Sequence, residues 1–587
     1  MPLPHALIGK RFHISKIKKG GYLMKKLFFV LLACLTLVPL ILAGCSSDNT
    51  TTTTTTTTTT KTTTTTASST TTSTTSVTTT TTSSMDYPIP LNPDAEKGGT
   101  MIINHNATIS FISAPADGPQ LYGRTARPVF EPLFLLDTDQ KVQPWLATSY
   151  TIATDGKAIT MTLREGIEFT DGTPFDAEAV KFNFELDLEK NIVGAAVLNN
   201  VVSYDIPDAH TITLNLAKPD ATLMFAITQT AIGLMASPTA QKAPVTPDTI
   251  TEVHMVGTGP FMYDSWQRDN YIQFKANPNY WQEGKPYLAG LRFNFVPDLT
   301  ASLLAFRSGQ ADLVWTIDPV DADKLKSEGY FVDSPPYLRY FHYLMPDGAN
   351  PDSPFAKLEV REALEYALHK SELAAVGNGY FDVATQFAIP LDPYYDSTIT
   401  PRDFNIAKCK ELLTEAGYPD GVDVIIVTNQ AIRVDTENLI LAQLEAGGFH
   451  VTKVDTQQSA AFFVTQQKGW KSTTPGVGAI LMPGFPAGDS LIGLVAFFTA
   501  GLYPDLYQPA GWLDGWNAVT TQVDDAQRNA TLKSLVRMAY DHALIIPYQT
   551  DGTRYVASSK VQGWKEYFLT NGFSDYYLPS EIWLKTK

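Results

Sequence analysis

The sequence predicts an α/β protein with more than one folded domain. Its 587 residues exceed what one hydrophobic core usually holds, since domains have about 100–200 residues. Strand patterns alternate with amphipathic helix patterns along the body, an order typical of α/β domains. We find no tandem repeat and no membrane-spanning run in the body; the apolar stretch 490–499 is too short to cross a bilayer.

Residues 24–45 show the three parts of a secretory signal in order. Lys25 and Lys26 precede an apolar stretch that ends at Ala43-Gly44-Cys45. The segment Leu42–Cys45 resembles the bacterial lipobox, in which cleavage precedes the cysteine and its sulfur receives a diacylglycerol. We therefore expect lipidation of Cys45 and attachment to the outer face of the cell membrane, with an uncleaved anchor as the alternative.

The remainder of the amino-terminal region has no pattern of a folded domain. Residues 1–23 are unusual ahead of a signal, so translation starts at Met1 or Met24. Residues 46–85 are dominated by Thr and Ser, which bury too little apolar surface to fold, and we expect a disordered tether. Its 35-residue Thr/Ser tract, 50–84, would span about 30–35 Å as a flexible chain.

Charge and cysteine content exclude several function classes. The 44 residues before Cys45 hold seven Lys or Arg and no acid, so the net charge of −16 becomes −23 for the rest. An acidic surface repels phosphate backbones, and we expect no nucleic-acid partner. Beyond Cys45 only Cys409 remains, which excludes an internal disulfide and a cysteine-rich metal site; we expect no cofactor.

The first part of the body, from about residue 86, is rich in strand patterns. Thr100–Asn104 is a predicted buried strand. Tyr150 and Ile152, then Ile159, Met161 and Leu163, alternate around the turn Asp155-Gly156, which predicts a hairpin. Asp176 is a predicted helix cap, and 211–216 a further strand. Later patterns predict helices at 301–308, 360–368, 405–416 and 437–446, and strands at 313–315, 337–344 and 422–427.

Seven motifs in order resemble family 5 of the bacterial extracellular solute-binding proteins, the dipeptide-, oligopeptide- and nickel-binding components of ABC importers. They extend over roughly residues 98–560. The motifs are Val142–Tyr150; Leu163-Arg164-Glu165-Gly166 with Phe169–Phe175 and Glu178-Ala179-Val180; Gly257–Phe261; Asn277–Trp281; Arg307–Asp312; Pro354-Phe355 with Val360–Leu364; and Leu412–Tyr418.

The resemblance implies a two-lobed, periplasmic-binding-protein-like clamshell. Lobe I would comprise residues 86–134, 238–335 and 546–587, with a β-rich subdomain, 135–237, inserted into it. Lobe II would comprise 336–545. The chain would cross the hinge near 337–344 and 544–548, and a ligand in the cleft would stabilise closure of the two lobes.

Candidate ligand-binding residues combine family position with suitable chemistry, because aromatic walls suit a cleft that accepts varied side chains. For each of them, plain core packing is the alternative. They are His105 and Phe111 after the first strand; Arg339, Tyr340 and His342 on the hinge strand; Phe485 and Asp489 in a late loop of lobe II; and Trp512 and Trp516.

Two departures from the family pattern concern this site. Peptide-binding members resembling this chain carry an Asp in a lobe II segment that pairs with the ligand's α-ammonium, whereas here Asp489 is offset and the expected position holds no acid. A buried ammonium without a carboxylate is costly. The second departure is Met345-Pro346, where the family often has an Asn.

Catalytic motifs are missing from the sequence. It has no Gly-x-Ser-x-Gly, His-Glu-x-x-His or Cys-x-x-Cys, and Gly257–Phe261 lacks the Lys-Ser/Thr of a nucleotide loop. Glu359, Glu362 and Glu365 lie at helical spacing with Lys357 and Arg361 among them, which predicts a solvated, salt-bridged face rather than paired catalytic acids.

The sequence thus predicts a monomeric, non-enzymatic binding lipoprotein that delivers a peptide or peptide-like solute to an ABC permease. Two alternatives stay open: a non-peptide solute such as a sugar or metal chelate, and a surface or sensory lipoprotein that kept the fold without transport. A secreted hydrolase is disfavoured because no nucleophile or metal constellation is recognisable.

Overall fold

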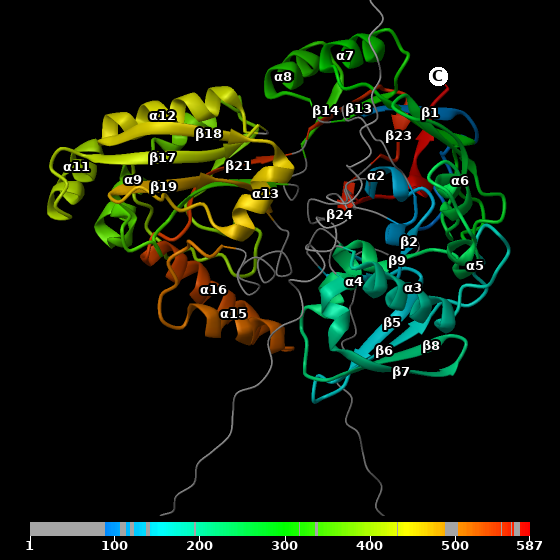
Figure 1. Ribbon diagram of the computed structural model, residues 1–587. Helices are drawn as coiled ribbons and strands as arrows, with labels where there is room; N and C mark the ends of the chain where they lie inside the picture. Colours follow the sequence, from blue (N-terminus) through cyan, green and yellow to red (C-terminus); the bar gives the residue numbers. More distant parts are fainter. Residues whose placement is uncertain are drawn as a thin grey trace, which may run out of the picture. The chain divides into compact units, whose positions relative to one another are not determined.

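The computed structural model describes residues 89–105, 113–117, 123–136, 141–192, 195–315, 317–334, 339–430, 432–487, 503–552, 554–564, 566–568 and 576–586. The predicted signal, Cys45, the tether, Phe111 and Asp489 lie outside these residues. Within them, no helix combines the length and apolar character needed to cross a membrane. Two seven-stranded sheets and one four-stranded sheet dominate the described chain (Figure 1).

The first sheet joins strands from distant parts of the chain. Its order is β10 (Phe261–Gln267), β11 (Tyr271–Ala276), β12 (Gly290–Phe295), β1 (Thr100–His105), β13 (Leu313–Trp315), β22 (Tyr555–Ala557) and β14 (Phe331–Asp333). β1 is parallel to β12 and β13, which puts their carboxyl ends at one edge. Helices α7 (Leu299–Arg307) and α8 (Pro319–Ser327) share a core cluster with β13 and β22.

The predicted hairpin is confirmed and belongs to the four-stranded sheet. Its order is β5 (Ala147–Ile152), β6 (Ala158–Leu163), β8 (Thr211–Leu216) and β7 (Val201–Asp208). Gly156 in the hairpin turn has a φ of 68°, a left-handed conformation that glycine adopts without strain. Helix α3 (Ala177–Lys190) begins as predicted, since the Asp176 carboxylate accepts a hydrogen bond from the Ala179 N–H.

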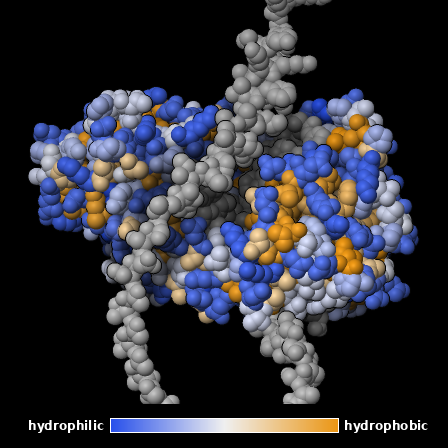
Figure 2. All heavy atoms as spheres, turned by 60° about the horizontal axis from the view of Figure 1, so that its bottom comes forward, coloured by the Kyte–Doolittle hydropathy of each residue, from blue (hydrophilic) through white to orange (hydrophobic). Residues whose placement is uncertain are grey.

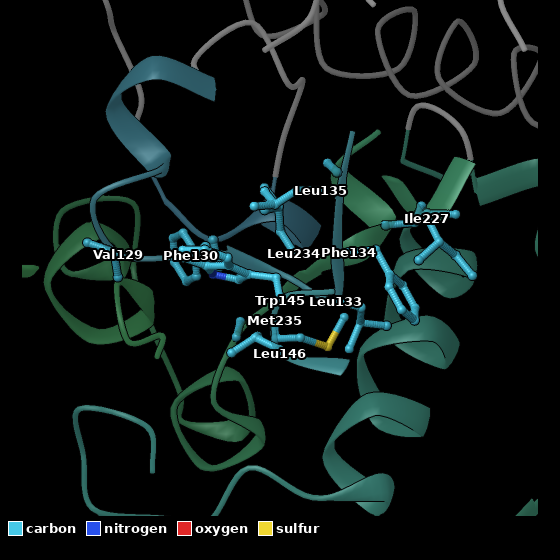
Figure 3. Close-up of a cluster of buried hydrophobic side chains, with 14 of the residues drawn as sticks. Val129, Phe130, Leu133, Phe134, Leu135, Trp145, Leu146, Ile227, Leu234 and Met235 are labelled. Atoms are coloured by element: carbon cyan, nitrogen blue, oxygen red, sulfur yellow. The ribbon is translucent and has the colours of Figure 1, made fainter. Parts of the chain in front are cut away.

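Smaller elements complete this part of the chain. They are α2 (Gly123–Ala126), β2 (Glu131–Pro132), β3 (Phe134–Leu136), β4 (Val142–Pro144), α4 (Leu223–Gln229), β9 (Leu234–Met235), α5 (Pro238–Lys242), α6 (Ile250–His254), β23 (Val561–Gln562), β24 (Glu566–Phe568), β25 (Tyr576–Tyr577) and β26 (Trp583–Leu584). Apolar side chains of β3, α4, β9 and β25 share one core with Trp145, Phe130 and Leu133 (Figure 3). Trp145 is 2% exposed, so its indole N–H needs a partner inside the protein, and Glu131 supplies it.

The second sheet has the order β16 (Phe381–Val383), β21 (Ile546–Gly552), β15 (Arg339–Pro346), β19 (Val477–Met482), β17 (Val422–Asn429) and β18 (Phe449–Gln457). β20 (Gly484–Ala487) pairs with the amino-terminal half of β15. β17 is parallel to β18 and β19, and β15 is antiparallel to β19 and β21. Lobe II was predicted to end at residue 545, but β21 (546–552) is part of this sheet, so the sheet continues beyond that residue.

Helices cover both faces of the second sheet (Figure 1). Leu344, Ile426 and Ile480 face a core shared with α9 (Leu358–Tyr366), α11 (Ile406–Glu415) and α12 (Val434–Gly447). Their strand neighbours point to the opposite face, toward α15 (Trp512–Thr521) and α16 (Asp525–Asp541). Helices α10 (Lys370–Ala375) and α13 (Ser459–Lys468) complete this part. Figure 2 shows hydrophilic residues over much of the visible described surface.

The predicted solvated face of α9 is wrong for Glu365 and Arg361. Glu365 is 2% exposed and bonds Lys370 and Arg402, at 2.8 Å and 2.9 Å. Arg361 is also 2% exposed and donates to the backbone carbonyls of Phe355 and His542. Helical spacing alone could not show that neighbouring elements cover this side of α9.

Asp347, just after β15, is a buried acid that accepts hydrogen bonds from Ser353, Asn350 and the Ser472 N–H. Burial outweighs these bonds and raises its pKa to about 6. A raised folded-state pKa stabilises the fold below the unfolded value, and this stabilisation is lost as the pH rises through about 6.

We therefore expect the free energy of unfolding of the native chain to fall relative to Asp347→Asn between about pH 4 and pH 7. Over this pH range the free energy of unfolding of the native chain should fall by about 3 kcal/mol relative to that of Asp347→Asn. Urea unfolding of both chains across this range measures it. A difference between the two chains that stays constant with pH would contradict the assignment.

Candidate functional site

The carboxyl ends of β17 and β19 mark one edge of the second sheet. At this edge β17 ends at Asn429 and β19 at Met482, while the antiparallel β15 begins at Arg339 and β21 ends at Gly552. Ligands of α/β sheets commonly bind beyond the carboxyl ends of parallel strands, where loops and helix amino termini converge. We refer to this edge as the ligand edge.

Four sequence-predicted residues meet at the ligand edge. The register pairs Arg339 with Ala487, Tyr340 with Pro486, and His342 with Gly484. Phe485 lies opposite Phe341 in the same ladder. The sequence had placed these residues in two segments more than 140 positions apart, and the pairing of β15 with β20 brings the two backbones together.

His342 forms the polar centre of this edge with an acid that sequence reasoning missed. Its Nε2 lies 3.5 Å from Oδ2 of Asp551 on β21, and both side chains are mostly buried. The His342 ring is 6.2 Å from that of Tyr548, whose pKa burial raises. His342 Nε2 makes no hydrogen bond within the described part of the chain. An imidazole beside a carboxylate provides both a donor and an acceptor for a polar ligand.

Arg433 is a second residue that the sequence reasoning missed. It occupies the N-cap position of α12, four residues after β17, without a capping side-chain bond, and its guanidinium pairs with Asp435 and with Asp318, the cap of α8. Side-chain bonds to Asp435 and Asp318 raise the pKa of Arg433. An Arg in the loop after a sheet strand was the available signal, but nothing in the sequence paired it with Asp318.

The other predicted residues lie on different elements. His105 ends β1 in the first sheet and meets the Phe295 ring edge-on at 6.5 Å. Trp512 and Trp516 are 1% and 3% exposed and pack edge to face at 5.6 Å within the core against α16. Both tryptophans are thus packed in the core, which is the alternative to ligand binding stated for them above. Among the described residues, no group of three or more His, Cys, Asp or Glu could hold a metal ion.

The family model of the bacterial extracellular solute-binding proteins, family 5, matches residues 141–485. The matched range includes the four-stranded sheet and most of the second sheet, with β15, β17 and β19.

Among curated proteins, the glutathione-binding protein GsiB of Salmonella paratyphi A is 29% identical over 305 residues, which cover 50% of this chain and 57% of the relative. GsiB of Escherichia coli O1:K1 is 27% identical over 346 residues, 57% of this chain and 66% of the relative. These alignments thus leave out at least a third of each relative.

Solved structures share the fold. DppA from Helicobacter pylori, in complex with peptide STSA, has a TM-score of 0.66 at 20% identity and covers 84% of this chain and 99% of its own. NikA from Brucella suis, in complex with Fe(III)-EDTA, has a TM-score of 0.69 at 21% identity and covers 82% and 100%. The α/β periplasmic-binding-protein fold predicted from the sequence is therefore confirmed.

Proposed function

Because this chain belongs to family 5 of the bacterial extracellular solute-binding proteins, we propose that it is the binding component of an ABC importer. In this role it captures a solute outside the cytoplasm and delivers it to a membrane permease, without catalysis. The family match over residues 141–485 carries the proposal, since it spans β15, β17 and β19 of the ligand edge.

We propose a peptide or peptide-like solute, bound at the ligand edge. A curated relative is named for glutathione and a structural neighbour holds a tetrapeptide. His342 and Asp551 offer a donor and an acceptor at 3.5 Å from each other, which suits the amide groups of a peptide. Tyr340 and Phe485 lie on the two paired strands beside them.

Native mass spectrometry of the gently purified full chain tests this function. We expect an added mass in the range of a small peptide, because binding proteins that enclose a ligand retain it. A ligand at 100 times its dissociation constant adds about 2.7 kcal/mol of stability, so a thermal-shift panel can verify the identification. A bare mass, followed by no shift with peptides, sugars or metal chelates, would favour the sensory lipoprotein.

Membrane attachment through Cys45 is a separate prediction. Lipid on this sulfur would hold the chain at the membrane, since apolar acyl chains partition into the bilayer. Replacing Cys45 by Ala should move the chain from the membrane fraction to the soluble fraction, with Cys409→Ala as the matched control. Retention of Cys45→Ala in the membrane would favour an uncleaved anchor at 24–45.

A further inference from the structure

A cavity of about 470 Å³ opens on the other face of the second sheet from His342. The register pairs Phe341 with Thr550, and Thr550 with Asp382 of β16. Residues opposite each other in a ladder share a face, so these three side chains form one wall, and His342 points away from it. All three line the cavity, whose volume lies in the range typical of small-ligand sites.

The opposite wall is the segment 384–395, which is held in place by its own hydrogen bonds. The Gln386 amide bonds both backbone groups of Asp396, at 3.0 Å and 2.9 Å, and the Asp392 carboxylate accepts from the Ile389 N–H at 2.7 Å. Phe387 stacks on Phe341 with ring centroids 5.0 Å apart. This wall is therefore formed before a ligand arrives, which lowers the entropic cost of binding.

Apart from Thr385 and Tyr395, the wall opposite the sheet is lined by apolar side chains. Ala388 and Ile389 form the depth of the wall and are 5% and 7% exposed, whereas Leu391 and Val383 are 59% and 47% exposed. Large aliphatic side chains exposed beside a cavity gain free energy when an apolar group covers them. The carboxylate of Asp382 and the hydroxyl of Thr550 are the polar groups of the sheet wall.

A mainly apolar cavity with one carboxylate on its wall fits a ligand with an apolar body and an ammonium group. We propose that this cavity binds the amino-terminal residue of a peptide that has an apolar side chain. The side chain enters between Ile389 and Leu391, and the α-ammonium pairs with Asp382. This inference rests on the proposed peptide-binding function, and it supplies from β16 the acid that the sequence lacks at the expected place near Asp489.

Isothermal titration of the full chain in lipid nanodiscs tests the inference with three probes: Leu-Leu-Leu, Ala-Ala-Ala and N-acetyl-Leu-Leu-Leu. We expect the native chain to bind Leu-Leu-Leu most tightly. Leu391→Ser should weaken Leu-Leu-Leu binding about tenfold and leave Ala-Ala-Ala nearly unchanged. Asp382→Asn should weaken both free tripeptides about tenfold or more and leave the acetylated one nearly unchanged.

Both substitutions affect exposed side chains, so the variants should fold. Leu513→Ser and Asp403→Asn are matched controls, because both residues are exposed and neither lines the cavity. If the native chain binds the tripeptides but neither variant changes the order of the three affinities, the inference is wrong and the proposed function stands. If the native chain binds none of them, a peptide with an apolar amino-terminal residue is not its ligand, and the inference fails with that part of the proposed function.

Discussion

Replacing Glu131 by Ala should destabilise the first part of the chain by about 4 kcal/mol or more. Glu131 is 4% exposed and accepts four side-chain hydrogen bonds. The Trp145 indole N–H and the Tyr280 hydroxyl donate to Oε1 at 2.9 Å and 2.6 Å, and Thr258 and Trp281 donate to Oε2, both at 2.9 Å. Truncation leaves these donors without an acceptor, at a cost of about 1–3 kcal/mol for each buried group.

Urea unfolding of the full chain measures this loss. Glu131→Gln keeps one acceptor oxygen and should lose less than Glu131→Ala. Burial raises the pKa of Glu131 in the folded state, although its four hydrogen bonds lower it. The native chain therefore loses folding stability as the pH rises through the folded-state pKa of Glu131. The difference in the free energy of unfolding between the native chain and Glu131→Gln should therefore become smaller as the pH rises. Glu178→Ala, at an exposed position of α3, is the matched control and should be nearly neutral.

If Glu131→Ala and Glu178→Ala unfold at the same urea concentration, the four bonds do not stabilise the native state. The opposite outcome would explain three of the motifs that identified the family. Trp145, Thr258 and the pair Tyr280-Trp281 belong to three separate motifs, and all of them donate to one carboxylate. These motifs are structural rather than ligand-binding.

Local patterns predicted the elements well, because local rules determine them. The Asp176 cap, the 150–163 hairpin and the helices at 405–416 and 437–446 all appear within a few residues of their predicted bounds. Side-chain partners across elements were not predictable in this way. Glu131 was not among the predicted residues, since a lone Glu before Pro132 has no periodicity that indicates four donors.

The candidate site shows the same division. The hinge strand and Phe485 were predicted from family position, and the pairing of β15 with β20 joins their backbones. Asp551 was missed because its proximity to His342 depends on the β15–β21 register, which includes a bulge between His342 and Tyr343. Trp512 and Trp516 were selected for their aromatic rings, yet a ring that packs in a core has the same sequence signature as one that binds a ligand.

Replacing Glu365 by Ala should destabilise the part of the chain around the second sheet by about 3–5 kcal/mol. Its carboxylate lies 2.8 Å from Lys370 Nζ and 2.9 Å from Arg402 Nη1, and the three side chains are 3%, 7% and 11% exposed. Arg402 keeps Glu362 and the Tyr540 carbonyl as partners, at 2.8 Å and 2.9 Å. Lys370 would be left as a buried cation whose carboxylate partner is gone, and this accounts for most of the expected loss.

A double substitution tests the role of the ion pair more sharply than the single substitution. The double variant Glu365→Met with Lys370→Met removes both charges, so it should be more stable than Glu365→Ala although it changes two residues. Glu359→Ala, at an exposed position of the same helix, is the control and should have little effect. The urea concentrations at the unfolding midpoints of the three variants measure these differences. If the double variant is the least stable, the ion pair itself stabilises the fold; if all three match the native chain, this side of α9 is solvated, as the sequence pattern had indicated.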